Sequence, residues 1–249
     1  MAAVNLTPND GADKATINEL KEKLVLANLI LDHENLAKPL GHISIRVPGT
    51  ETFLISRDVA PGMVVVEDIL ICDMNGKVVQ GKYPRTFSEV AIHTGIYRKR
   101  GDIKSVAHTH SLHIIALSMT ETPLLPASFS AIKAGTEPIA LFKKTDHIDK
   151  RELGEEIADL LGPNKAVILK GHGAVVVGQT IEETIDTAVE LEVAAGLQLL
   201  ASPPVRTLVP FTEQEKRPFI EFRKGSGPVP IGALRRWAYY RSLLKEKVR

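Results

Sequence analysis

The stretch AVILKGHGAVVV, residues 166–177, decides how this chain folds. Its two apolar runs, 166–169 and 174–177, have the length and the β-branched content of buried strands. Glycine on each side of His172 permits a tight turn and the close approach of neighbouring backbone. A histidine needed only for packing would not require flanking glycines, so we predict that His172 presents its imidazole at a strand end.

A second strand also ends in histidine. Residues 103–107 are mainly apolar and lead into His108-Thr109-His110. Because side chains i and i+2 of a strand point the same way, the imidazoles of His108 and His110 should project side by side. Taken alone, the pair would more simply be two polar residues at a strand end. With His172 the pair can complete a three-histidine set, and we predict one divalent ion per subunit: zinc, manganese, cobalt or iron.

Glu89 is the carboxylate that could join this set. It follows the segment 84–88, PRTFS, and a helix is expected over residues 86–100 with Thr86 or Ser88 as its cap. A carboxylate in the first turn of a helix is favoured by the helix dipole. Two interpretations of Glu89 therefore stay open, a fourth metal ligand or active-site carboxylate, and a helix-capping glutamate.

The composition is that of an ordinary globular protein. Of the 249 residues, 44% are apolar and 24% charged, and the net charge of +1 gives no field for binding nucleic acid or anionic lipid. The single cysteine, Cys72, excludes an intrachain disulfide and favours a reducing compartment. No apolar run reaches the roughly 18 residues that a membrane span needs. We expect a cytoplasmic protein with a small-molecule substrate and with neither nucleic acid nor membrane as a partner.

The remaining pattern is mixed α and β. It predicts a flexible arm over 1–14, a domain over 15–201 and a C-terminal extension over 202–249, which packs on the domain or on a neighbouring subunit. Further elements are expected from hydrophobic periodicity and turn residues. They are a helix from residue 15, strands at 42–47 and 53–56, one or two strands over 63–73, a hairpin turn at 75–76, and helices over 150–161 and 180–200.

Four short segments resemble, in the same order, those of the class II aldolase/adducin family, and the resemblance spans about residues 17–201. The segments are Gly41-His42-Ile43-Ser44-Ile45-Arg46, Ser88-Glu89, His108-Thr109-His110 and Gly171-His172-Gly173. The resemblance implies an α/β fold of three layers, a central, mainly antiparallel sheet flanked by helices. It also implies a homotetramer with sites between subunits. By resemblance the three histidines are metal ligands and Glu89 is the active-site glutamate, a set that the adducin branch lacks, so a lyase is expected.

Three positions depart from the family's sugar-phosphate pattern of Gly-Asn, a small-residue turn and Ser-Ser. They read Gly41-His42, Ser56-Arg57-Asp58 and Phe87-Ser88. Phe87 offers a flat apolar surface for an aromatic ring, and His42 is a candidate proton donor. Arg46 and Arg57 offer planar forks for a carboxylate, unless Arg46 is structural and Arg57 simply exposed. Ser88 completes the expected substrate-binding set.

These departures resemble the family's decarboxylases of hydroxylated aromatic or pyridine dicarboxylates, as does the segment 232–240. That segment could close over a neighbour's site or form an amphipathic surface helix. We therefore predict a metal-dependent decarboxylase in which the metal stabilises the carbanion left by CO₂, with Glu89 or His42 as the acid that protonates carbon. The alternatives are an aldolase or epimerase acting on a sugar phosphate or hydroxy-keto acid, and a non-catalytic adducin-like module.

Overall fold

The computed structural model describes residues 14–202, 207–224 and 229–244. The predicted flexible arm lies outside the described residues except for Lys14, which begins the first helix. Parts of the predicted C-terminal extension also lie outside them, so its boundaries remain a prediction.

Within the described residues the strands form one sheet of eight, in the order β4-β3-β2-β1-β5-β8-β7-β6. Every neighbouring pair is antiparallel except β6 and β7, which run parallel. The mainly antiparallel sheet expected from the family resemblance is therefore confirmed. The strands are β1 (His42–Arg46), β2 (Thr52–Ser56), β3 (Ile69–Asp73), β4 (Val78–Gln80), β5 (Ser105–Thr109), β6 (Leu141–Phe142), β7 (Ala166–Leu169) and β8 (Gly173–Gly178).

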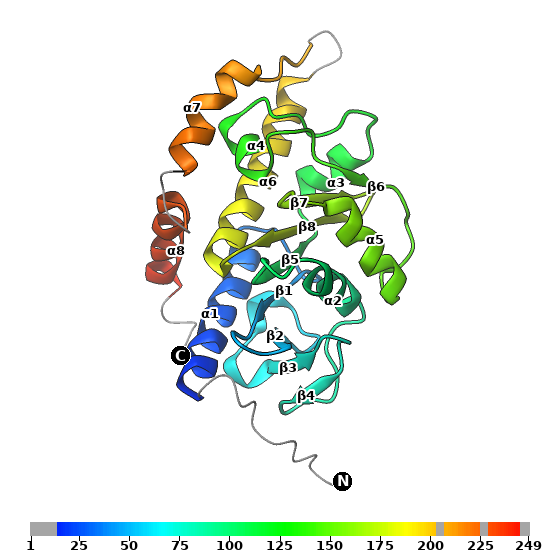
Figure 1. Ribbon diagram of the computed structural model, residues 1–249, viewed down its shortest axis with the longest axis vertical. Helices are drawn as coiled ribbons and strands as arrows, with labels where there is room; N and C mark the ends of the chain where they lie inside the picture. The colour runs from blue at the N-terminus through cyan, green and yellow to red at the C-terminus, as the bar shows by residue number, and fades with distance from the viewer. Residues whose placement is uncertain (1–13, 203–206, 225–228, 245–249) are drawn as a thin grey trace.

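Helices cover both faces of the sheet, as Figure 1 shows. On one face lie α1 (Lys14–His33), α3 (Leu112–Ser118) and α6 (Ile181–Ala201), and on the other lie α2 (Val90–Lys99) and α5 (Arg151–Leu161). Two apolar cores result, because successive residues of a strand point to opposite faces. Ile43 and Ile45 of β1 pack in the α1/α6 core, whereas Phe53 and Val106 pack in the α2/α5 core. Ser44, between the two isoleucines, thus faces α2.

Three helices lie beyond this framework: α4 (Phe129–Ala134), α7 (Glu213–Lys224) and α8 (Ile231–Leu243). Figure 1 shows α8 alongside α6. Arg236 of α8 binds Asp186 at 2.9 Å and Glu190 at 2.6 Å, both on α6. In the single chain, the described part of the C-terminal segment therefore packs on its own domain. Along the described ranges, none of the helices is long and apolar enough to cross a lipid bilayer.

The span 63–73, expected to hold one or two strands, holds one, β3, after the 3-10 turns η1 (Pro61–Met63) and η2 (Val66–Asp68). One predicted boundary was wrong, because the helix expected from residue 86 begins at Val90. Its predicted caps are engaged elsewhere, since the Thr86 hydroxyl donates to the Ser56 carbonyl at 2.7 Å and the Ser88 hydroxyl pairs with His147.

Candidate metal centre and active site

Strand register brings the predicted histidines to one end of the sheet. His42 of β1 lies opposite His108 of β5, and His108 lies opposite Val175 of β8. His110 follows β5 and His172 precedes β8, so both emerge at that same end. Glu89 reaches them from the start of α2. Each of the four residues offers a ligand atom, and these atoms lie within 4.8 Å of one another. We call Glu89, His108, His110 and His172 the cluster.

The glycines beside His172 are required by the backbone. Gly171 has φ 65° and Gly173 has φ 156°, conformations that other residues rarely adopt. A Cβ on Gly173 would lie 1.8 Å from the carbonyl oxygen of Thr109. Only glycine therefore lets β8 begin this close to β5. This approach holds the His172 ring 4.8 Å from those of His108 and His110, centroid to centroid.

The cluster residues fit a divalent cation. Glu89 Oε1, His108 Nε2 and His110 Nε2 are buried without a hydrogen-bond partner among the described residues, which is unusual for buried polar atoms. His108 Nδ1 lies 3.1 Å from the Ala174 carbonyl and donates to it, which leaves a lone pair on Nε2. Three imidazoles and a carboxylate form a donor set typical of zinc and related ions.

The charge state of the cluster also suits a cation. Burial, then the neighbouring His108, lowers the pKa of His110 to about 3, and the same causes lower the pKa of His172. Burial raises the pKa of Glu89, but the proximity of His108, then of His172 and His147, outweighs it and brings the pKa to about 2. At neutral pH Glu89 is therefore a carboxylate and His110 a neutral imidazole, the forms that bind a metal ion.

Glu89 does not act as a helix cap. It occupies the residue before Val90, yet its side chain makes no capping hydrogen bond. Instead its carboxylate oxygens lie 3.5 Å from His108 Nε2 and 3.6 Å from His172 Nε2. Of the two interpretations left open by the sequence, the placement fits the active-site carboxylate.

His42 and Phe87 lie next to the cluster as a stacked pair. The His42 side chain is buried, and its Nε2 lies 4.0 Å from Glu89 Oε2. The Phe87 ring packs on it with centroids 4.4 Å apart and is itself only 8% exposed. Phe87 therefore supports His42 from behind, and little of its ring is open to a ligand.

The two predicted arginines lie at opposite ends of the paired strands β1 and β2. Arg57 directly follows β2, and the β1/β2 register places it beside His42 at the cluster end of the sheet. Its Nε donates to Asp68 at 2.6 Å and its guanidinium lies 4.7 Å from the Tyr83 ring centroid. Arg46 lies at the opposite end of β1, where it donates to the carbonyls of Tyr97 and Ile103 and stacks on the Tyr97 ring. The structure does not bring Arg46 to the cluster, and its placement fits the structural alternative.

Two histidines at the site were not singled out from the sequence. His147, between β6 and α5, lies with Nε2 2.9 Å from Ser88 Oγ and Nδ1 3.8 Å from Glu89 Oε1. Its side chain is 58% exposed, so it stands at the open side of the cluster. His93 is buried behind His42, with 2.7 Å between His93 Nε2 and His42 Nδ1. Its spacing of four from Glu89 on a helix is a signal that could have found it.

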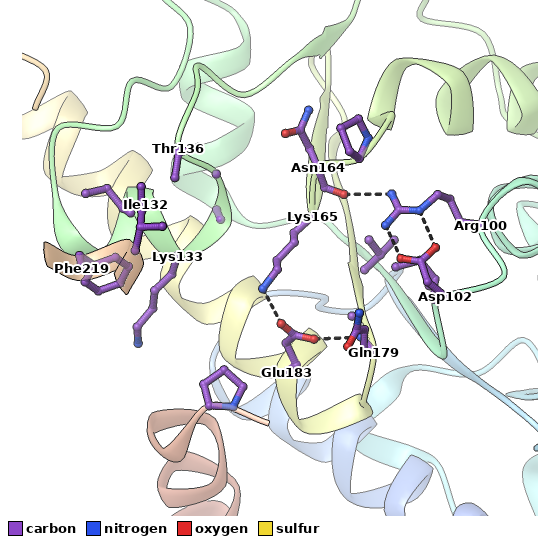
Figure 2. Close-up of a pocket in the computed structure, with 18 residues that line it drawn as sticks. Arg100, Asp102, Ile132, Lys133, Thr136, Asn164, Lys165, Gln179, Glu183 and Phe219 are labelled. Atoms are coloured by element: carbon purple, nitrogen blue, oxygen red, sulfur yellow. Dashed lines mark hydrogen bonds and ion pairs between the residues drawn. The ribbon is translucent and has the colours of Figure 1, made fainter. Parts of the chain in front are cut away.

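A separate cavity of about 520 Å³ lies at the other end of β5 and β8, near Gly178. Figure 2 shows that four of its charged side chains form two pairs. Arg100 pairs with Asp102, and Lys165 pairs with Glu183. We therefore assign the chemistry to the cluster and not to this cavity.

Comparison with known proteins agrees with this geometry. The model of the Class II Aldolase and Adducin N-terminal domain matches residues 22–199, which include the whole cluster. An L-fuculose phosphate aldolase from Methanococcus maripaludis is 30% identical over 182 residues, 71% of this chain and 94% of that protein. A 3,4-dihydroxyphthalate decarboxylase from Arthrobacter keyseri is 29% identical over 195 residues, 72% of this chain and 77% of that protein.

The fold is shared with solved structures as well. An aldolase II superfamily protein from Pseudomonas syringae superposes with a TM-score of 0.82 at 25% identity, covering 98% of this chain and 96% of the other. The match therefore extends over the sheet, both helix layers and the residues that form the cluster. This chain belongs to the class II aldolase and adducin N-terminal domain family.

Proposed function

We propose that the protein is a metal-dependent carbon–carbon lyase that releases CO₂ from an ortho-hydroxylated aromatic or heteroaromatic acid, such as a dihydroxyphthalate or a hydroxypyridine dicarboxylate. The observation that carries the proposal is the cluster itself, together with the residues beside it. Where sugar-phosphate enzymes of the family place an amide and small hydroxyl residues, this chain has His42 and Arg57 at the cluster end of the sheet and Phe87 packed behind His42. The similarity to a 3,4-dihydroxyphthalate decarboxylase supports the same reaction.

Glu89, His108, His110 and His172 would hold the ion, and their nitrogen and oxygen donors suit zinc, manganese, cobalt or iron. When bound, the ion supplies Lewis-acid stabilisation of negative charge on a substrate oxygen. The residues of the chain supply the remaining functions. Glu89 is ionised and can take up and return a proton, while His42 directs Nε2 toward Glu89 and the space beside it.

Arg57 is the residue proposed to bind a second carboxylate of the substrate. Asp68 holds its Nε and Tyr83 supports the plane of its guanidinium, so the fork is oriented before a ligand arrives. A guanidinium can hold a carboxylate through two parallel hydrogen bonds, which the ammonium group of lysine cannot reproduce. His147 and Ser88 line the exposed side of the cluster and are proposed to contact the substrate there.

The alternative activity is retro-aldol cleavage of a sugar phosphate. The similarity to an L-fuculose phosphate aldolase at 30% identity favours it. A third function, a non-catalytic module, would leave the convergence of four ligand atoms without a use.

The deciding experiment compares two reactions of the unmodified protein loaded with metal. We expect CO₂ release from a hydroxylated aromatic dicarboxylate to have the higher kcat/KM, and faster cleavage of a ketose 1-phosphate would contradict the proposal. Arg57→Lys should lower kcat/KM for the dicarboxylate about tenfold, and less for an analogue without the second carboxylate. Arg46→Lys, at the remote end of β1, is the matched control and should not change that ratio between substrates.

We also propose a closed homo-oligomer, a tetramer, in which a neighbouring subunit covers the open side of the site. In the single chain the side chain of His172 is 28% exposed and that of His147 58% exposed. Light scattering on the purified protein tests the assembly, and a fully active monomer would contradict it.

A further inference from the structure

A row of hydrogen bonds leads from the cluster into the interior beneath α2. His42 Nδ1 lies 2.7 Å from His93 Nε2, His93 Nδ1 lies 2.6 Å from Ser44 Oγ, and Ser44 Oγ lies 2.7 Å from the Tyr97 hydroxyl. Strand β1 supplies His42 and Ser44 at positions i and i+2, and α2 supplies His93 and Tyr97 at positions i and i+4. All four side chains are at most 2% exposed.

The facing nitrogens of the two buried imidazoles lie 2.7 Å apart, so one ring donates a hydrogen bond and the other accepts it. The row can therefore run in only two directions. Either the ring of His42 donates inward through Nδ1, which leaves a lone pair on Nε2, or His93 donates outward to Nδ1 and the proton of His42 sits on Nε2.

The inner end of the row selects between the two directions. The side-chain hydrogen bond of the buried Tyr97 hydroxyl is the one with Ser44 Oγ, at 2.7 Å, and a buried hydroxyl needs an acceptor for its proton. At the outer end, His42 Nε2 lies 4.0 Å from Glu89 Oε2, so an N–H on Nε2 can point toward the cluster. In the favoured direction, the Tyr97 hydroxyl donates to Ser44, Ser44 donates to His93, and His93 donates to His42.

We propose that His93, Ser44 and Tyr97 are positioning residues that hold His42 in the tautomer protonated on Nε2, so that His42 offers a hydrogen-bond donor to the substrate. His42 Nε2 is buried and has no hydrogen-bond partner among the described residues, so the donor has a free direction toward the cluster. The role at the substrate rests on the proposed lyase function. The tautomer itself depends only on the contacts within this chain.

The first test reads the tautomer directly in the metal-free protein. Histidine is labelled with ¹⁵N, the ring signals of His42 are identified by their loss in His42→Gln, and the protonated nitrogen is read by NMR. We expect the proton on Nε2 in the unmodified protein. A proton on Nδ1 would overturn the proposal, whether or not the protein releases CO₂.

The second test separates positioning from packing. His93→Phe keeps a ring but removes the donor to His42, whereas His93→Gln keeps an N–H that can reach His42 Nδ1. We expect His93→Phe to mix the two tautomers and to lower kcat for CO₂ release about tenfold, with metal content and KM nearly unchanged. His93→Gln should restore both the Nε2 tautomer of His42 and the kcat of the unmodified protein. Thr94→Ala, a buried change on the same helix outside the row, is the matched control and should leave kcat unchanged.

If His93→Phe keeps both the tautomer and the kcat of the unmodified protein, the positioning role is wrong. If His93→Phe does not fold, the comparison of His93→Gln with the unmodified protein still decides the tautomer, because loss of the Nε2 proton in His93→Gln contradicts the proposal. A protein with the expected tautomer and without lyase activity would contradict the proposed function and leave the hydrogen-bonded row in place.

Discussion

Glu89 occupies a helix-cap position in the sequence, but its side chain contacts the other residues of the cluster. Its place before α2 is that of a helix cap, but its carboxylate turns away from the backbone N–H groups and toward His108 and His172. The pKa of about 2 keeps it ionised at neutral pH. Its contribution is therefore expected in the reaction and not in the stability of the helix.

Glu89→Gln tests that assignment, because it keeps the shape of the side chain and removes the charge. We expect a loss of about 10²-fold or more in kcat, the usual scale for a general acid–base group, with little change in thermal stability. Glu152→Gln, in the first turn of α5, is the matched control and should keep full activity. A mutant of Glu89 that unfolds more easily but retains kcat would show a structural role instead.

At the scale of elements, the strand ends were the most predictable part of the site. The apolar runs before His108 and on both sides of His172 predicted strands that the structure contains, and the flanking glycines predicted the close approach of β8 to β5. His147 could not be predicted, because an irregular segment carries it back to Ser88, 59 residues earlier in the chain. Arg46 was misplaced because sequence proximity to His42 says nothing about which end of β1 faces the cluster.

The two glycines beside His172 allow a matched comparison. Both have positive φ, but a Cβ on Gly173 would collide with the Thr109 carbonyl, whereas a Cβ on Gly171 would meet no atom within 4 Å. We expect Gly171→Ala to lower the free energy of unfolding by about 1 kcal/mol through backbone strain, and Gly173→Ala by roughly 3 kcal/mol or more. Denaturant unfolding measures both. Equal losses for the two variants would mean that β8 does not need this close approach to β5.

At the scale of the whole molecule, the cluster and the apolar cores occupy different parts of the sheet. One end of β1, β5 and β8 carries the cluster, both faces carry apolar cores, and the layer between β1 and α2 holds a buried polar row. The α/β/α architecture was predictable from the family resemblance. The polar row was not, because it depends on how α2 crosses β1.

That buried row makes stability depend on pH. The folded pKa of His93 is about 3, below the ordinary value of 6.5, because burial disfavours its charged form. Below pH 6.5 the unfolded chain therefore takes up a proton at His93 that the folded chain refuses, and the free energy of unfolding falls as the pH falls from 6.5 toward 3. His93→Gln should reduce this slope by about 1.4 kcal/mol per pH unit in the metal-free protein, measured by denaturant unfolding between pH 7 and about pH 5. Parallel stability curves for the two proteins would contradict the buried, neutral state of His93.

The most direct test of the account is the metal content of two histidine variants. The protein is stripped with a chelator, reloaded with zinc or manganese, dialysed and measured by elemental analysis. The unmodified protein and His113→Ala, whose imidazole binds Glu192 on the surface, should each retain about one ion per chain. His110→Ala, three residues away but within the cluster, should lose most of the ion and the lyase activity with it. Unchanged metal content in His110→Ala would contradict the assignment of the cluster as a metal centre.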